Sequence, residues 1–179
     1  MSKKILLLHG WGGSDNPHWQ SWLAGELAKE YGCVNFLKFS DVDAPKLDVW
    51  KRELNATLEE FKPDIVLCHS LANTLWFHLC NTQTLHKIEK LYLVAPPSMS
   101  CDIEELKEFF PLQTPTNLYA KEAILVTSTN DPYMSENEAE ELQKKLNIPM
   151  KTLTNAGHIN ADSGYGEWEW ILKEFRAKS

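Results

Sequence analysis

The chain has 179 residues, 43% of them hydrophobic and 24% charged, which fits one globular domain with a sizeable core. The net charge of −7 argues against nucleic acid as a partner, because phosphate binding needs clustered Lys and Arg. No apolar run approaches the roughly 20 residues that span a membrane, and none resembles a signal peptide, so we expect a cytoplasmic protein without a membrane partner. The four cysteines form no C-x-x-C pair, which favours free thiols over disulfides or zinc.

Short apolar runs alternate with helical stretches along the whole chain. Apolar spacing predicts helices over residues 19–31, 47–61, 70–80, 135–146 and 168–175. An S-x-x-E capping box, Ser135 with Glu138, opens the fourth of them. The predicted strands are Ile5–Leu8, Val34–Phe39, Ile65–Cys68, Leu91–Ala95, Ala123–Thr127 and Met150–Leu153. This alternation predicts an α/β fold of about six parallel strands with helices on both faces.

One proline-rich stretch, residues 96–121, interrupts the alternation. We expect it to form a loop-side insertion within a single domain spanning residues 1–179. Two interpretations of its apolar residues stay open: Phe109, Phe110 and Leu112 line an apolar site, or they anchor the segment to the core.

The strand over residues 65–68 leads to Ser70, and a helix follows at once. A sharp strand-to-helix turn exposes a serine Oγ and needs small residues two positions away on each side, usually glycines. Here those positions hold Cys68 and Ala72, which are small but lack the conformational freedom of glycine. Two hypotheses remain at this point: Ser70 is a nucleophile, or it only caps the helix. A thiolate nucleophile at Cys68 is disfavoured, since its side chain would be buried in the strand.

The first strand ends in the glycine-rich run His9-Gly10-Trp11-Gly12-Gly13. A loop of this kind can supply a backbone N–H to an oxyanion hole, so we expect the N–H groups of Trp11 and Leu71 to serve as the two donors. A phosphate-binding loop is less consistent with the residues, because neither G-x-G-x-x-G nor a closing Lys-Ser/Thr is present. A glycine turn without a ligand is the remaining alternative.

Two later loops supply a base and a carboxylate in the order that a Ser…Asp…His triad requires. His158 follows the last predicted strand, and Asp131 follows the fifth. A carboxylate at Asp131 could orient the imidazole of His158 and stabilise its charged form. Asp131 could equally start a turn, and Asp102 competes for the carboxylate role. Asp131 is preferred because it lies closer to the end of its strand.

These residues together resemble the α/β-hydrolase superfamily, and more narrowly the small serine hydrolases similar to retinoblastoma-binding protein nine. The resemblance covers nearly the whole chain and is carried by H-G-W-G-G at residues 9–13, N-P-H-W-Q-S-W at 16–22, H-S-L at 69–71, N-D-P at 130–132 and G-H at 157–158. It implies a triad of Ser70, Asp131 and His158. It also implies a minimal sheet with strand order 2-1-3-4-5-6 and little or no lid.

We therefore expect a serine hydrolase that transfers the acyl group of a small ester to water, with no metal and no organic cofactor. An amidase or aminopeptidase-like enzyme with the same triad is the closest alternative. A protein-binding module with a vestigial triad is the second, with Trp11, Phe109 or Phe110 as an exposed patch for a protein partner. Contact between Ser70 and His158 beside an open cleft would favour the enzyme.

Overall fold

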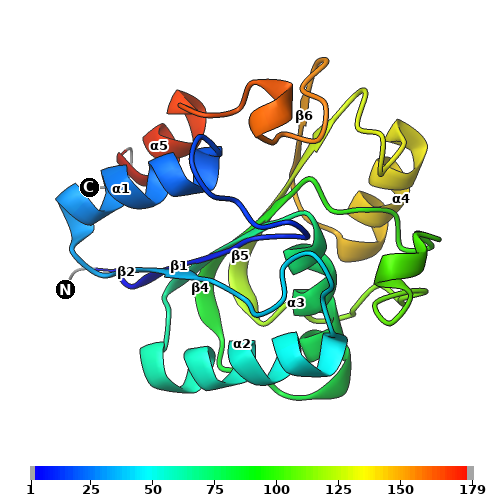
Figure 1. Cartoon of the computed structure of the whole chain (residues 1–179), viewed down its shortest axis with the longest axis horizontal. Coiled ribbons are helices and arrows are strands. Elements are labelled where there is room, and N and C mark those ends of the chain that lie inside the picture. Colours follow the sequence, from blue (N-terminus) through cyan, green and yellow to red (C-terminus); the bar gives the residue numbers. More distant parts are fainter. Residues whose placement is uncertain (1–2, 177–179) are drawn as a thin grey trace.

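A computed structural model of the protein describes residues 3–176. Its centre is a six-stranded, wholly parallel sheet with the order β2-β1-β3-β4-β5-β6, so the predicted fold class and strand order are confirmed (Figure 1). The strands are β1 (Ile5–Leu8), β2 (Val34–Leu37), β3 (Ile65–His69), β4 (Ile88–Val94), β5 (Ala120–Ser128) and β6 (Met150–Leu153).

Five α-helices cover the two faces of the sheet: α1 (Trp19–Tyr31), α2 (Leu47–Phe61), α3 (Leu71–Thr82), α4 (Glu136–Leu146) and α5 (Glu169–Arg176). Helices α1 and α5 lie on one face, and α2 and α3 lie on the other (Figure 1). The capping box at the start of α4 is present, with Ser135 accepting from the backbone N–H of Glu138. Every helix expected from the apolar spacing is found.

The alternation of side chains along β1 divides the core into two layers. Ile5 and Leu7 belong to the cluster that packs under α1 and α5, whereas Leu6 and Leu8 belong to the cluster under α2 and α3. All four side chains are fully buried. A strand buried on both faces has a continuous apolar sequence, so β1 could be predicted from its apolar run.

Strands β4 and β5 both begin three residues before the predicted positions. The ladder between them starts at the pair of Ile88 with Ala120. Charged residues, Lys90 and Glu122 among them, occupy these early positions, so the apolar runs in the sequence begin only after them. Backbone pairing in a parallel ladder does not require apolar side chains, so the strands extend through charged positions.

The segment between β4 and β5 contains one short 3₁₀ helix, Glu104–Leu106. Phe109 is fully buried and packs edge-on against Trp50, with 5.8 Å between ring centroids. Its backbone oxygen also meets Nε2 of His78 at 2.9 Å. Phe109 therefore anchors the segment to the core, and its expected place in an exposed aromatic patch is wrong.

Candidate active site

Ser70 occupies a sharp turn between β3 and α3. Its backbone has φ 54° and ψ −123°, in a region that favours glycine, and its side chain makes no capping hydrogen bond to the helix. The capping role that the sequence left open is therefore absent. A non-glycine residue in this conformation costs about 1–3 kcal/mol, and such strain is typical of a serine held at a strand-to-helix elbow.

The two small residues that flank the elbow tolerate it without glycine. Cys68 and Ala72 are fully buried, and neither has a positive φ. The unusual backbone conformation is thus confined to Ser70. Burial also raises the pKa of the Cys68 thiol well above its ordinary value, which disfavours the thiolate and argues against Cys68 as the nucleophile.

Gly10 lies directly against the elbow. A Cβ added at this position would stand 2.7 Å from Cβ of Ser70, with backbone atoms of the two neighbouring residues at 3.1 Å. Only glycine permits such a close approach. His9, the residue before Gly10, holds the loop in place. Its Nδ1 donates to the Gly10 carbonyl at 2.7 Å, and its Nε2 accepts from the backbone N–H of Phe39 at 2.9 Å.

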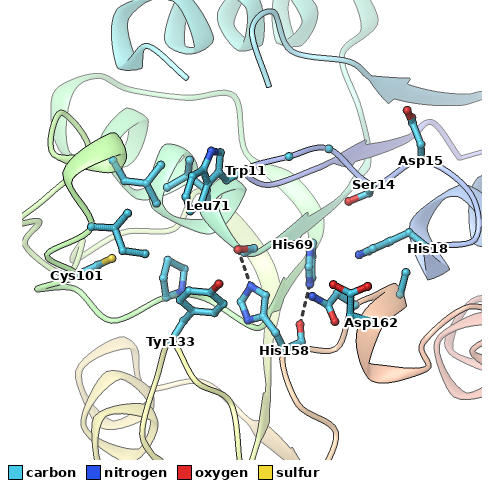
Figure 2. A pocket seen from close by; sticks show the side chains of 18 residues that line it. Trp11, Ser14, Asp15, His18, His69, Leu71, Cys101, Tyr133, His158 and Asp162 are labelled. Atoms are coloured by element: carbon cyan, nitrogen blue, oxygen red, sulfur yellow. Dashed lines mark hydrogen bonds between the residues drawn. The ribbon is translucent and has the colours of Figure 1, made fainter. Parts of the chain in front are cut away.

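His158 connects Ser70 to Asp131. Its Nε2 lies 2.7 Å from Oγ of Ser70 (Figure 2). Its Nδ1 lies 3.0 Å from each carboxylate oxygen of Asp131. Because a carboxylate only accepts, Nδ1 carries the proton and Nε2 is free to accept from the serine hydroxyl. The Asp131 side chain is 3% exposed and also accepts from the backbone N–H of Tyr133 at 2.9 Å.

The end of β5 holds the histidine loop in place. Ser128, Thr129 and Asn130 accept hydrogen bonds at 2.8–2.9 Å from three consecutive backbone N–H groups of residues 155–157. Oδ1 of Asn130 also accepts from the Ser128 hydroxyl at 2.9 Å. The loop that carries His158 is therefore tied to the loop that carries Asp131 by three side chains.

The chain matches one known protein family over most of its length. The model of the family described as "Serine hydrolase" matches residues 5–177. The chain belongs to this family. No curated protein sequence gives a significant match.

Several solved structures have a similar fold. The ydeN gene product of Bacillus subtilis is 17% identical, with a TM-score of 0.82 over 98% of this chain and 97% of its own. A YdeN-like hydrolase from Pectobacterium atrosepticum is 25% identical, with a TM-score of 0.76 over 96% of this chain and 87% of its own. An esterase domain from a Rhodothermus marinus protein is 14% identical, with a TM-score of 0.62 over 98% of this chain and 85% of its own. The serine hydrolase thus has the α/β-hydrolase fold.

The hydrolase has a pocket of about 360 Å³ beside Ser70, within the range of small-molecule sites. Trp11 and Leu71 line it, as do Ile103 and Leu106 from the segment between β4 and β5. That segment therefore contributes to the wall of the pocket, although Phe109, Phe110 and Leu112 are not among the lining residues. Contact between Ser70 and His158 beside an open pocket is the geometry expected of an enzyme.

His69 is buried beside the site, and its hydrogen bond to the backbone of His158 was not predicted from the sequence. Its Nε2 lies 3.0 Å from the backbone oxygen of His158 and therefore donates to it. Burial lowers the pKa of His69 well below its ordinary value, so the ring is neutral near pH 7. His69 thus supports the backbone of His158 without placing a positive charge beside it.

Asp102 is the carboxylate that does not reach the histidine. It is exposed on the segment after β4, whereas Asp131 contacts His158. The anchoring roles of Ser128 and Asn130 were also missed, although the polar run before Asp131 was a signal for them.

Residues 3–176 contain no group of three or more His, Cys, Asp or Glu side chains arranged to hold a metal ion. Across the same residues, no helix combines the length and apolar character needed to cross a membrane.

Proposed function

We propose that this serine hydrolase cleaves small carboxylic esters through a triad of Ser70, His158 and Asp131. The observation that carries the proposal is the continuous contact from Oγ of Ser70 through the imidazole of His158 to Asp131, at 2.7 Å and 3.0 Å, beside a pocket. Nucleophile, base and orienting carboxylate all lie within hydrogen-bond reach, as acyl transfer by serine requires.

In the first half of the reaction, Oγ of Ser70 attacks the ester carbonyl while Nε2 of His158 accepts the serine proton. Asp131 accepts from Nδ1 and stabilises the imidazolium that forms. The tetrahedral intermediate collapses, the C–O bond of the ester breaks, and the leaving alcohol takes the proton from Nε2. Water then attacks the acyl-serine with His158 again as base, which releases the acid and regenerates Ser70.

Backbone donors near Ser70 support the second part of the proposal, an oxyanion hole formed by the N–H groups of Trp11 and Leu71. Both residues line the pocket, and neither N–H is bonded to an acceptor within residues 3–176. Leu71 is the first residue of α3, where N–H groups lack helical partners and the helix dipole favours negative charge. Two such donors would stabilise the charge that develops on the carbonyl oxygen.

The four cysteines support a cytoplasmic location, which we propose as well. Cys33, Cys68, Cys80 and Cys101 are all free thiols. Unpaired thiols persist in reducing compartments, whereas small secreted domains tend to use their cysteines in disulfides.

Matched ester and amide substrates test the proposed reaction. We expect the purified protein to hydrolyse nitrophenyl acetate and butyrate well above the buffer rate, with kcat/KM for the nitroanilides of the same acids at least about 100-fold lower, because an amine leaves less readily than a phenolate. Release of the chromophore measures both series. Equal or faster cleavage of the anilides would favour the amidase, and no cleavage of either series would contradict a hydrolase of small acyl substrates.

Asn130 tests the anchoring of the histidine loop. Replacing it with alanine leaves the N–H of Gly157 without its acceptor, so we expect kcat for the ester to fall about tenfold while KM changes little, since the loop positions His158 rather than the substrate. The exposed Asn137 on α4 provides a matched control, and Asn137→Ala should leave kcat unchanged. An Asn130→Ala variant with wild-type kcat would show that this bond does not position the base.

A further inference from the structure

The pocket beside Ser70 has two chemically different halves. In Figure 2, Trp11, Leu71, Cys101 and Tyr133 lie on one side of His69, and Ser14, Asp15, His18 and Asp162 lie on the other. The first half is mainly apolar. The second half carries hydroxyl, imidazole and carboxylate groups, none of which belongs to the proposed triad or oxyanion hole.

His18 contributes an unused hydrogen-bond donor to the polar half. It caps α1, with Nδ1 accepting from the backbone N–H of Gln20 at 3.1 Å, so the proton of the neutral ring lies on Nε2. Nε2 is buried and has no partner within residues 3–176, and the residue as a whole is only 4% exposed. Burial, together with nearby His158, lowers the pKa of His18 to about 4, so the donor is uncharged near neutral pH.

Ser14 contributes a second unused group to the same half. Its residue is 3% exposed, and its Oγ has no hydrogen-bond partner within the described chain. The backbone around it is fixed, because the hydroxyl of Ser21 donates to the Ser14 carbonyl at 2.6 Å. Figure 2 shows the Ser14 hydroxyl and the His18 ring both directed toward the space beside His69. A buried polar group without a partner costs about 1–3 kcal/mol, so two such groups lining one pocket indicate that a ligand satisfies them.

We propose that Ser14 and His18 form a substrate subsite that binds an uncharged oxygen acceptor, such as an ether, hydroxyl or carbonyl oxygen, on the ester cleaved at Ser70. This inference rests on the proposed esterase function. The donor at Nε2 selects an acceptor, and the exposed carboxylates of Asp15 and Asp162 on the pocket lining disfavour an anion. The other half of the pocket would take the apolar part of the same substrate.

His18 also packs edge-on against His69, with 4.7 Å between ring centroids, so a purely structural role must be separated from binding. The variant His18→Asn suits this purpose, since asparagine is a favoured helix N-cap and retains an acceptor for the Gln20 N–H. It lacks any atom at the position of Nε2. Ser14→Ala is the second variant, and His86→Asn at an exposed site away from the pocket is the matched control.

Two pairs of esters, each differing by one CH₂-to-oxygen exchange, measure the contact. Pentyl acetate against ethoxyethyl acetate probes the alcohol side, and ethyl hexanoate against ethyl ethoxypropanoate probes the acyl side. For each enzyme we take the ratio of kcat/KM for the ether ester to that for its hydrocarbon partner. Comparing this ratio between variant and wild type cancels both the intrinsic reactivity of the esters and any general loss of activity.

We expect His18→Asn to lower the ratio about fivefold to tenfold in one of the two pairs, because one hydrogen bond to the ether oxygen is lost. Ser14→Ala should lower the ratio in the same pair. His86→Asn should leave both ratios unchanged. Ratios equal to wild type in both pairs, for both variants, would overturn the subsite even if activity fell. A wild-type protein that cleaves none of the four esters and is not labelled at Ser70 by a fluorophosphonate would overturn the proposed function and the subsite together.

Discussion

Replacing Ser70 with alanine should lower kcat for the best ester by about 10⁴-fold or more, to near the buffer rate, because the nucleophile and the proton donor to His158 are lost together. Oγ is the only atom removed, and it makes no capping bond to α3. The fold should therefore be retained, with a melting temperature close to that of the wild type. Stopped assays at high enzyme concentration measure the residual rate.

The exposed Ser100 offers a matched control for this substitution, and Ser100→Ala should keep full activity. If the Ser70→Ala variant retained even a tenth of the wild-type kcat, the reaction would have to use another nucleophile. Buried Cys68 is a poor substitute, since its pKa is raised by burial.

Replacing Gly10 with alanine should be the most damaging change outside the triad. The new Cβ would stand 2.7 Å from Cβ of Ser70, and neither the elbow nor the loop after β1 can yield by rotating a side chain. We expect the loop to shift away from the elbow and move the Trp11 N–H out of position. A displacement of about 1 Å at reacting groups costs about 100-fold in kcat, and overpacking costs about 1–3 kcal/mol of stability.

Substitution of Gly25 with alanine is a matched control, because the space around Gly25 is open rather than tightly packed. Gly25 lies within α1, and a Cβ there would meet nothing within 4 Å. Gly25→Ala should therefore stabilise the protein by about 0.5–1 kcal/mol and leave kcat unchanged. Urea unfolding and ester kinetics on both variants measure the contrast. Wild-type activity in Gly10→Ala would contradict the tight contact between the loop and the elbow.

Much of this site was accessible from the sequence because parallel sheets gather the ends of their strands at one edge. Ser70, Asp131 and His158 each follow a predicted strand closely, so the approximate place of each side chain followed from the alternation of strands and helices. The strand order came instead from the family resemblance. Apolar periodicity alone does not say which strands are neighbours.

The remaining features depend on contacts between loops that are distant in sequence. Small residues at positions 68 and 72 concern the elbow's own backbone, whereas the glycine that the elbow needs is Gly10, in the loop after the neighbouring strand β1. Likewise, the bond from His69 to the backbone of His158 joins residues 89 positions apart. Such contacts leave no local periodicity or spacing by which a single sequence could reveal them.

The most direct test of the account is to identify the residue that a fluorophosphonate modifies. The intact protein should gain the mass of one adduct, and peptide mapping should locate that adduct on Ser70. His158→Ala should slow labelling by about 100-fold or more, because the serine hydroxyl loses its base. An adduct on any other residue, or labelling at an undiminished rate without His158, would contradict the assignment of Ser70 as the nucleophile activated by His158.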